Sequence, residues 1–385
     1  MPDLLAQRTV DDLARAIDAD EPLTVVDTRP PDSFEAWHVP GAVNVPYHPV
    51  DGLGAGFTWD DVAAVVDGQP VAVVCARGLA STAFGFELSR RGYENVSVVK
   101  GGMVDWSKLY DVVEIEAGDD LCLAQIQRRA KGCLGYVVGD PAAREALVVD
   151  PTRQHHEHEL VAADAGLVVT GVLDTHVHAD HLSGGRDLAE RLSVPYYLSA
   201  DATARDLKYD FDPISDGETL SVGSVDVAVR AAPGHTTEHV SLLVGGEYLL
   251  SGDALFVESV GRTELELGEE GAETGAEMLY ETIHERYGDL ADDVVVLPGH
   301  VSVGADGTFA VGRPGDVVAG RLGDLRADLE LFSLDREAFV ERVAADAGGD
   351  QPANYRAIID ANRGVFELEP DEGEELELGP NNCAV

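Results

Sequence analysis

The segment Thr-His-Val-His-Ala-Asp-His directly follows an apolar strand-like run and constrains the fold of this chain more than any other feature. It places three imidazoles and a carboxylate within six residues, where they can converge on one point: His176, His178, Asp180 and His181. Three more candidate ligands follow strand patterns downstream: His235, Asp253 and His300. Imidazole combined with carboxylate favours zinc or iron. The pattern therefore predicts a metal site where several strands end in loops.

The rest of the chain divides into regions that differ in the spacing of their apolar residues and so in predicted secondary structure. Up to Trp106, short apolar strands such as 71–75 alternate with loops and helical patterns, which indicates an α/β unit. The segment 107–120 is interpreted as a connector, and strands dominate from about residue 118. After His300 the apolar spacing becomes helical, and Ser333 is expected to start a further helix. The acidic end from Glu369 is predicted to be loop-like, with one possible edge strand.

Size and charge limit the possible partners and locations. A chain of 385 residues exceeds what one core usually serves, so two domains are expected. No apolar run is long enough for a bilayer span, and the start is interpreted as an amphipathic helix rather than a signal peptide, which predicts a cytoplasmic protein without a membrane partner. The net charge of −44 argues against nucleic acid. Such a charge is tolerable where molar salt shortens the Debye length to about 3 Å, and with four lysines it predicts a halophilic source.

The pattern HxHxDH…H…D…H, matched at every position, resembles the metallo-β-lactamase superfamily. This resemblance implies an αββα sandwich over 118–310, followed by a helical C-terminal extension with an acidic tail over 311–385. Within the superfamily, glyoxalase II and the persulfide dioxygenases share the motif and differ in their use of metal.

The resemblance implies two alternative sets of ligands, which the ligand types alone leave open. Hydrolase members hold two metals, and carried over here the first site is His176, His178 and His235, the second is Asp180, His181 and His300, and Asp253 bridges them. Persulfide dioxygenases hold one iron, here through His176, His235 and Asp253, a facial triad with open positions for substrate and dioxygen. The remaining motif residues then orient ligands and bound water, which gives Asp180 a catalytic role.

A second segment favours the dioxygenase group. Gly261, Arg262, Thr263 and Glu264 resemble the Gly-Arg-Thr-acid run that follows the metal Asp in that group, although Glu stands in place of the commoner Asp. Arg262 could act catalytically by pairing with the carboxylate of a thiol substrate, and Thr263 would help to bind it. The alternative for Arg262 is a structural salt bridge.

Residues 22–106 resemble a rhodanese domain, which we expect to occupy 1–112 as an α/β unit. The match is carried by Asp27, Arg29, His38, Pro40, Gly41 and Ala42, and by a closing Gly-Gly…Trp. Cys75 then takes the place of the catalytic nucleophile, where backbone N–H groups and a helix N-terminus would stabilise its thiolate. Arg77 and Gly78 are expected to contact the substrate. Ala80 stands where active rhodaneses often have Arg, which argues against thiosulfate as the sulfur donor.

Several other histidines and cysteines are interpreted as structural or solvent-exposed residues rather than as catalytic or metal-binding ones. His155, His156 and His158 are interpreted as a solvated loop or helix start, and His239 as a supporting residue. Three cysteines are expected to be small apolar fillers: Cys122, Cys133 and Cys383.

The leading prediction is a non-haem iron persulfide dioxygenase with one Fe(II) per chain, which converts a small-molecule thiol persulfide and dioxygen to sulfite. The rhodanese-like domain would transfer sulfur through Cys75. The alternative is a binuclear zinc thioesterase of glyoxalase II type. A third hypothesis makes the N-terminal domain a non-catalytic sensor or carrier. Self-association into a homo-oligomer is left open.

Overall fold

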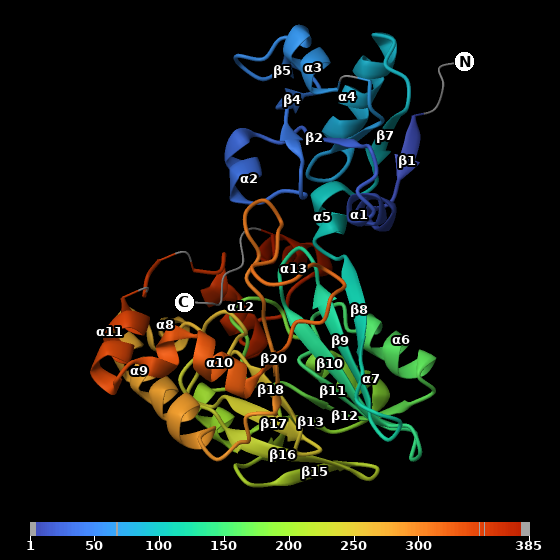
Figure 1. Cartoon of the computed structure of the whole chain (residues 1–385). Helices are drawn as coiled ribbons and strands as arrows, with labels where there is room; N and C mark the ends of the chain where they lie inside the picture. The colour runs from blue at the N-terminus through green and yellow to red at the C-terminus, as the bar shows by residue number, and fades with distance from the viewer. Residues whose placement is uncertain (1–4, 67, 346, 350, 379–385) are drawn as a thin grey trace.

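A computed structural model of the chain describes residues 5–66, 68–345, 347–349 and 351–378 and places them in two α/β units (Figure 1). Cys383 and the end of the acidic tail lie outside these ranges. Figure 1 shows the smaller unit, blue to cyan, at one end of the larger one, with the connection near α5 and β8. Within the described ranges, no helix is long and apolar enough to cross a membrane.

The first unit is a parallel sheet with the strand order β1-β7-β6-β2-β3. Its strands are β1 (Ala6–Arg8), β2 (Thr24–Asp27), β3 (Val43–Asn44), β6 (Val71–Val74) and β7 (Val96–Val99), beside a hairpin of β4 (Tyr47–His48) and β5 (Gly52–Leu53). Its helices are α1 (Val10–Asp18), α2 (Pro31–Ala36), α3 (Trp59–Val65), α4 (Leu79–Arg90) and α5 (Gly102–Trp106). The expected opening helix is α1, which a capping box between Thr9 and Asp12 starts, but a strand that was not predicted precedes it.

The second unit contains two mixed sheets, with strand orders β14-β13-β12-β11-β10-β9-β8 and β15-β16-β17-β18-β19-β20. The first sheet is built from β8 (Tyr110–Ile115), β9 (Cys122–Arg128), β10 (Leu134–Asp140), β11 (Glu145–Val149), β12 (Val168–Leu173), β13 (Tyr196–Ser199) and β14 (Asp212–Ile214). The second is built from β15 (Thr219–Val222), β16 (Val225–Ala231), β17 (Val240–Val244), β18 (Tyr248–Gly252), β19 (Val295–Pro298) and β20 (Gly320–Arg321).

Helices cover the outer face of each sheet. They are α6 (His156–Asp164) and α7 (Gly185–Leu192) on the first sheet, and α8 (Glu264–Leu267), α9 (Ala272–Glu281), α10 (Leu322–Asp328) and α11 (Arg336–Ala344) towards the second. Short helical turns lie at η1 (Ala200–Arg205), η2 (Glu269–Gly271), η3 (Thr282–Arg286) and η4 (Glu330–Ser333).

Three apolar clusters fill the spaces between these layers. One lies between the sheets and includes Tyr136 of β10 and Val227 of β16. Val137, the next residue of β10, points to the opposite face and packs with Leu188 of α7, as strand geometry requires. The third cluster joins the second sheet to α9 and its neighbours. The layers therefore confirm the predicted αββα sandwich.

The connection between the units is shorter than expected. Residues 107–120 were interpreted as a connector, but Tyr110–Ile115 forms β8 and pairs antiparallel with β9 along its whole length. Residues 110–112, assigned to the first domain from sequence, therefore extend the sheet of the second. The alternating burial of β8 is typical of an edge strand with one face on a core.

The C-terminal extension is helical, as predicted, with two corrections. The expected helix after Ser333 begins at Arg336 instead, because the side chain of Asp335 caps it by accepting a hydrogen bond from the Ala338 N–H. The possible edge strand in the acidic end is absent among the described residues there. That stretch forms α13 (Pro370–Leu376), which follows α12 (Tyr355–Asn362) and has proline in its first turn.

Ion pairs and hydrogen bonds tie the two units together. The guanidinium of Arg129 in the second unit donates to Asp18 of α1 at 2.8 Å and to Asp111 of β8 at 2.7 to 2.8 Å. The backbone N–H of His38 donates to the carbonyl of Ala305 at 2.8 Å. His38, one of the residues that carry the resemblance to a rhodanese, therefore lies at the joint between the units.

Candidate metal centre

The strands of the sandwich deliver the predicted ligands to one end of the fold. The Thr-His-Val-His segment begins two residues after the end of β12, and Asp253 directly follows β18. His235 comes after β16 and His300 after β19. All seven predicted ligands are buried, and none is more than 7% exposed.

His176, His235 and Asp253 form one group, in which potential ligand atoms from the three side chains lie within 4.8 Å of one another. The Asp253 Oδ2 atom is 3.9 Å from the Nε2 atom of His176 and 3.7 Å from that of His235. The Nδ1 atom of His235 donates to the backbone carbonyl of Arg262 at 2.7 Å, which leaves Nε2 pointing at the group. The structure therefore brings together the three residues predicted to hold a single iron.

His178 belongs to a neighbouring group that the sequence analysis missed. Its Nε2 atom lies 3.3 Å from Asp150 Oδ1 and 3.9 Å from Asp174 Oδ1. Both aspartates directly follow apolar strands, β11 and β12, so the signal that identified Asp253 was also present for them. His178 stays close to the triad, since its ring centroid is 4.2 Å from that of His176.

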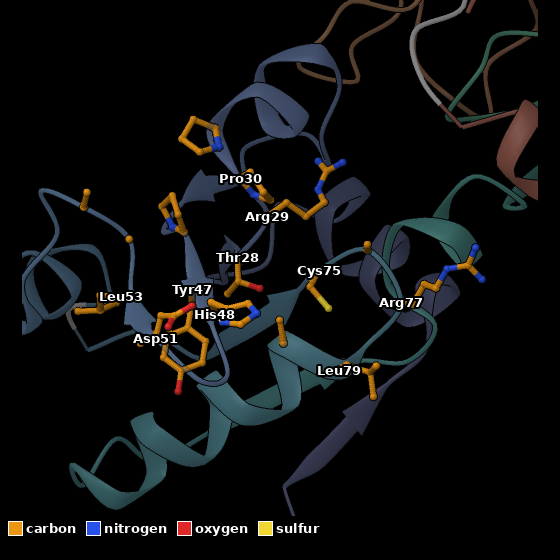
Figure 2. Close-up of a pocket in the computed structure, with 17 residues that line it drawn as sticks. Thr28, Arg29, Pro30, Tyr47, His48, Asp51, Leu53, Cys75, Arg77 and Leu79 are labelled. Carbon is orange, nitrogen blue, oxygen red and sulfur yellow. Dashed lines mark ion pairs between the residues drawn. The ribbon is translucent and has the colours of Figure 1, made fainter. Parts of the chain in front are cut away.

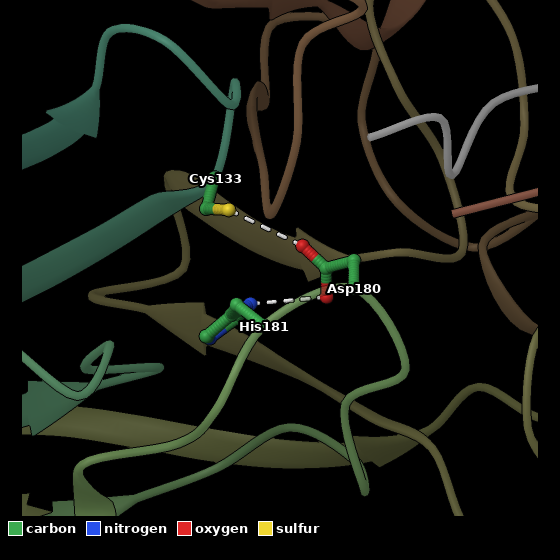
Figure 3. A group of neighbouring side chains, drawn as sticks. All are labelled: Cys133, Asp180 and His181. Carbon is green, nitrogen blue, oxygen red and sulfur yellow. Dashed lines mark hydrogen bonds and ion pairs between the residues drawn. The ribbon is translucent and has the colours of Figure 1, made fainter. Parts of the chain in front are cut away.

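Asp180 lies at the centre of a third group (Figure 3). Its Oδ1 atom accepts a hydrogen bond from His181 Nδ1 at 3.0 Å, and its Oδ2 atom lies 3.6 Å from His300 Nδ1. The thiol of Cys133 donates to the same Oδ2 atom at 3.2 Å. Cys133 was interpreted as an apolar filler, and this was wrong: the turn between β9 and β10 carries its sulfur to the predicted metal ligands. Cys122 packs beside the outer core as expected.

These residues fit a metal ion. Among the described residues, the buried Nε2 atoms of five predicted ligands have no hydrogen-bond partner: His176, His178, His181, His235 and His300. A buried polar atom without a partner costs about 1 to 3 kcal/mol, and a cation would remove that cost. Burial lowers the pKa of His235 and of His300 to about 4, so both rings are neutral at pH 7, the form that binds a metal. Burial and the negative charge of Asp180 raise the pKa of Asp253, so the site favours an added positive charge.

A hydrogen bond to His239 positions the backbone of Asp253, and two glycines leave the space that this arrangement needs. The backbone N–H of Asp253 donates to His239 Nε2 at 3.0 Å, and the His239 ring stacks on His176 at 5.0 Å between centroids. Gly252 has a φ of +52°, and a Cβ there would lie 2.4 Å from His239 Nε2. A Cβ on Gly299 would lie 2.7 Å from the Asp253 carboxylate. The predicted supporting role of His239 agrees with this geometry.

The Gly-Arg-Thr-acid run lies beside the triad, and its side chains contact one another, Gln351 and nearby backbone. Arg262 is 2% exposed, and its Nε and Nη2 atoms both lie 2.8 Å from Glu264 Oε1. The Thr263 hydroxyl donates to the carbonyl of Ala272 at 2.9 Å. Of the two roles considered for Arg262, the structure contains the salt bridge. Substrate contact by Arg262 or Thr263 stays a prediction.

Cys75 lies at the edge of a cavity in the first unit, directly after β6 (Figure 2). Its sulfur accepts a hydrogen bond from the Gly78 N–H at 3.1 Å and lies 3.4 Å from Ser81 Oγ of α4. Gly78 has a φ of +90°, which lets the loop turn back onto the sulfur. The cavity has a volume of about 620 Å³, and Ala80 is part of its lining.

The two arginines near Cys75 are paired with carboxylates. Arg29 is buried and donates to Asp27 at 2.7 to 3.1 Å. Arg77 is 47% exposed in its side chain and lies 3.2 Å from Glu375 of α13. In Figure 2 its side chain points away from Cys75.

The histidine cluster near residue 156 is partly different from the prediction. A helix does start there, with His155 as its N-cap residue, and His156 is exposed. His158, however, is fully buried rather than solvated, because it faces β10 at Gly135. Burial lowers its pKa to about 3.

Comparisons with known proteins agree with this geometry. Residues 9–109 match the rhodanese-like domain family and residues 129–301 match the metallo-beta-lactamase superfamily. The mitochondrial persulfide dioxygenase ETHE1 of Bos taurus is 30% identical over 167 residues, which are 43% of this chain and 62% of the relative. The hydroxyacylglutathione hydrolase of Polaromonas sp. is 32% identical over 169 residues, 43% of this chain and 60% of the relative. The chain thus spans less than two thirds of either relative.

A solved structure supports the same assignment. The crystal structure of ETHE1 from Myxococcus xanthus has a TM-score of 0.54 and 26% identity, and the match covers 64% of this chain and 99% of that one. Both resemblances drawn from the sequence are therefore confirmed. The chain belongs to the metallo-beta-lactamase superfamily and carries a rhodanese-like domain ahead of its metal-binding domain.

Proposed function

We propose that this chain oxidises a low-molecular-weight thiol persulfide to sulfite with one ferrous ion held by His176, His235 and Asp253. The observation that carries the proposal is the convergence of these three side chains, while His178 turns towards Asp150 and Asp174. Two imidazoles and one carboxylate are the ligand set of non-haem iron sites that react with dioxygen. The similarity to persulfide dioxygenases supports the same choice.

The overall reaction balances without a further oxidant. One persulfide, one dioxygen and one water give one thiol, one sulfite and two protons. The outer sulfur loses the electrons that dioxygen takes up, and the sulfur–sulfur bond breaks. A ferrous ion held by the triad would supply the redox chemistry that this reaction of dioxygen requires.

The chain itself orients the ligands and limits access of water. The Arg262 carbonyl fixes the His235 ring, and His239 fixes the backbone of Asp253. Such outer hydrogen bonds hold ligands in one orientation. Asp180 accepts hydrogen bonds from the Cys133 thiol and the His181 ring, so it orients both groups beside the triad.

We propose that Cys75 exchanges sulfane sulfur with a thiol persulfide rather than with thiosulfate. The arginine and histidine side chains among the described lining residues each lie beside a carboxylate: Arg29 beside Asp27, Arg77 beside Glu375, and His48 beside Asp51 at 2.8 Å. A dianion such as thiosulfate would need a cation that is not already paired. In the transfer, the Cys75 thiolate attacks the outer sulfur, and the donor thiolate leaves with the electron pair of the broken bond.

The proposal is tested by anaerobic purification with metal counting, followed by oxygen uptake and sulfite release on a small persulfide. We expect one iron per chain and equal amounts of dioxygen consumed and sulfite formed. Stoichiometric iron without oxygen uptake on any persulfide would overturn the proposal.

A binuclear zinc thioesterase is the second candidate. Cys133, Asp180 and His181 offer ligand atoms within 4.8 Å of one another, enough for a second ion beside the triad. The similarity to hydroxyacylglutathione hydrolases also favours this candidate. Two zinc ions per chain together with hydrolysis of a thioester would establish it.

A further inference from the structure

The C-terminal strap, which we define as residues 369–378, lies between the two units and contacts residues that neighbour both sites in the sequence. It contains α13, which Figure 1 shows between α5 of the first unit and the sheets of the second. Glu375 pairs with Arg77, two residues after Cys75, and Glu374 pairs with Lys108 in the connection between the units. Leu378 lines a cavity of about 400 Å³ together with Ala76.

Glu377 anchors the strap in the second unit through a complete set of carboxylate contacts. Its Oε1 atom accepts from Arg128 Nη1 at 2.9 Å and from the Leu182 N–H at 3.1 Å. Its Oε2 atom accepts from Arg128 Nη2 at 3.2 Å and from Arg153 Nη2 at 3.3 Å. A two-pronged guanidinium, a second guanidinium and a backbone N–H form a receptor of the kind that recognises free carboxylates.

This receptor adjoins the metal centre. Leu182, whose N–H contacts Glu377, is the residue after the predicted ligand His181. A ligand whose carboxylate took the place of Glu377 would therefore lie beside His181 of the Asp180 group.

The receptor is more elaborate than attachment of the strap requires. Arg128 is 1% exposed and Glu377 is 4% exposed, so both charges have lost their water. A buried ion pair gains little net stability because desolvation offsets the attraction, and an apolar contact would hold the strap as well. The other charged contacts of the strap are more exposed and add little.

We propose that the pocket formed by Arg128, Arg153 and the Leu182 N–H binds the carboxylate of the substrate thiol, and that Glu377 occupies it in the resting chain. The inference rests on the proposed persulfide oxidation for the identity of the ligand. A carboxylate-bearing thiol competes with Glu377 and displaces the strap. Displacement also separates Glu375 from Arg77, so that ligand binding at the metal centre changes the surroundings of the Cys75 loop.

The test compares two thiols of the same shape, 3-mercaptopropionate and its neutral amide, by calorimetry on the anaerobic iron-loaded full chain. In the Glu377→Gln variant, which removes the competing charge, 3-mercaptopropionate should bind roughly tenfold more tightly than in wild type, and the amide should bind unchanged. Glu375→Gln is the matched control, because it removes a carboxylate from the same helix without touching the pocket. Arg153→Gln should weaken binding of the acid and leave the amide unaffected.

A second measurement needs no variant and guards against a folding defect in Glu377→Gln. Saturation of wild type with 3-mercaptopropionate should speed amide hydrogen exchange over residues 371–378, and the amide should not. Equal affinity for the two thiols in wild type and in Glu377→Gln, or unchanged exchange in the strap, would show that Glu377 is a structural anchor and overturn the inference. Neither measurement needs turnover, so this result is separate from a failure to oxidise persulfides.

Discussion

The metal centre and the Cys75 site are positioned by different numbers of structural elements. The ligands of the metal centre come from the ends of strands in both sheets of the sandwich, and all of them are buried. Cys75 belongs to a single loop between β6 and α4, opens onto a cavity, and has the exposed Arg77 as a neighbour. The first site depends on two sheets meeting correctly, and the second on one local turn.

This difference predicts that the two proposed activities respond separately to mutation. A change at the metal centre removes a group that several elements have been arranged to hold, so its effects on metal binding should be large. A change in the Cys75 loop should affect sulfur transfer without affecting the sandwich. The following predictions test that separation, in order of decreasing effect.

Asp253→Ala should have the largest effect. It removes the carboxylate of the triad, so we expect iron content below a tenth of wild type and persulfide oxidation lowered about 1000-fold or more. Metal analysis and oxygen uptake provide the measurements. Asp289→Ala, which breaks an exposed pair with Arg230, is the control. Full iron content in Asp253→Ala would contradict the assignment of the triad.

Cys75→Ser should abolish sulfur transfer and leave the metal in place. Loss of a nucleophile lowers its reaction by about 1000-fold or more, so transfer from a persulfide to an acceptor thiol should fall by that amount. Cys122→Ser, on β9, is the control. Transfer at the wild-type rate would instead support the hypothesis that the rhodanese-like domain is a non-catalytic carrier or sensor.

His239→Ala should weaken metal binding without abolishing it. The variant removes the acceptor for the Asp253 N–H, and loss of such an outer hydrogen bond costs about 10- to 100-fold in affinity. Titration against a competing chelator measures the change, and His156→Ala, at an exposed histidine of α6, is the control. An unchanged affinity would mean that the sheets alone position Asp253.

Arg77→Gln should have the smallest effect. Its pair with Glu375 is exposed, and such pairs contribute about 0 to 1 kcal/mol to stability. We expect sulfur transfer within about threefold of wild type, and a denaturant midpoint close to that of Arg90→Gln, which breaks a similar surface pair with Glu87. A loss of tenfold or more in transfer would show that Arg77 contacts the substrate, as predicted from the sequence.

The fold and the triad could be predicted because local signals coincide with tertiary positions. Each metal residue follows an apolar run, and the ends of neighbouring strands meet at one edge of a sheet. The same rule applied to Asp150 and Asp174 would have identified the partners of His178. Those two aspartates lie outside the matched motif and were passed over for that reason.

Other features depend on contacts that no local pattern encodes. Cys133 reaches Asp180 because β9 and β10 pair in one particular register, which places their turn beside the motif loop. Glu377 is one of many acids in the C-terminal stretch, and it is distinguished only by its distant partners, which are Arg128, Arg153 and the Leu182 N–H. The halophilic source and the cytoplasmic location stay predictions.

The guanidinium of Arg129 couples the unfolding of the two units. It reaches Asp18 in the first unit while it also holds Asp111 in the second, so its full set of bonds exists only when both units are folded. These ion pairs stabilise both units at once, so unfolding of one unit also lowers the stability of the other. We expect the two units to denature in a single cooperative transition, unlike domains connected only by a flexible linker.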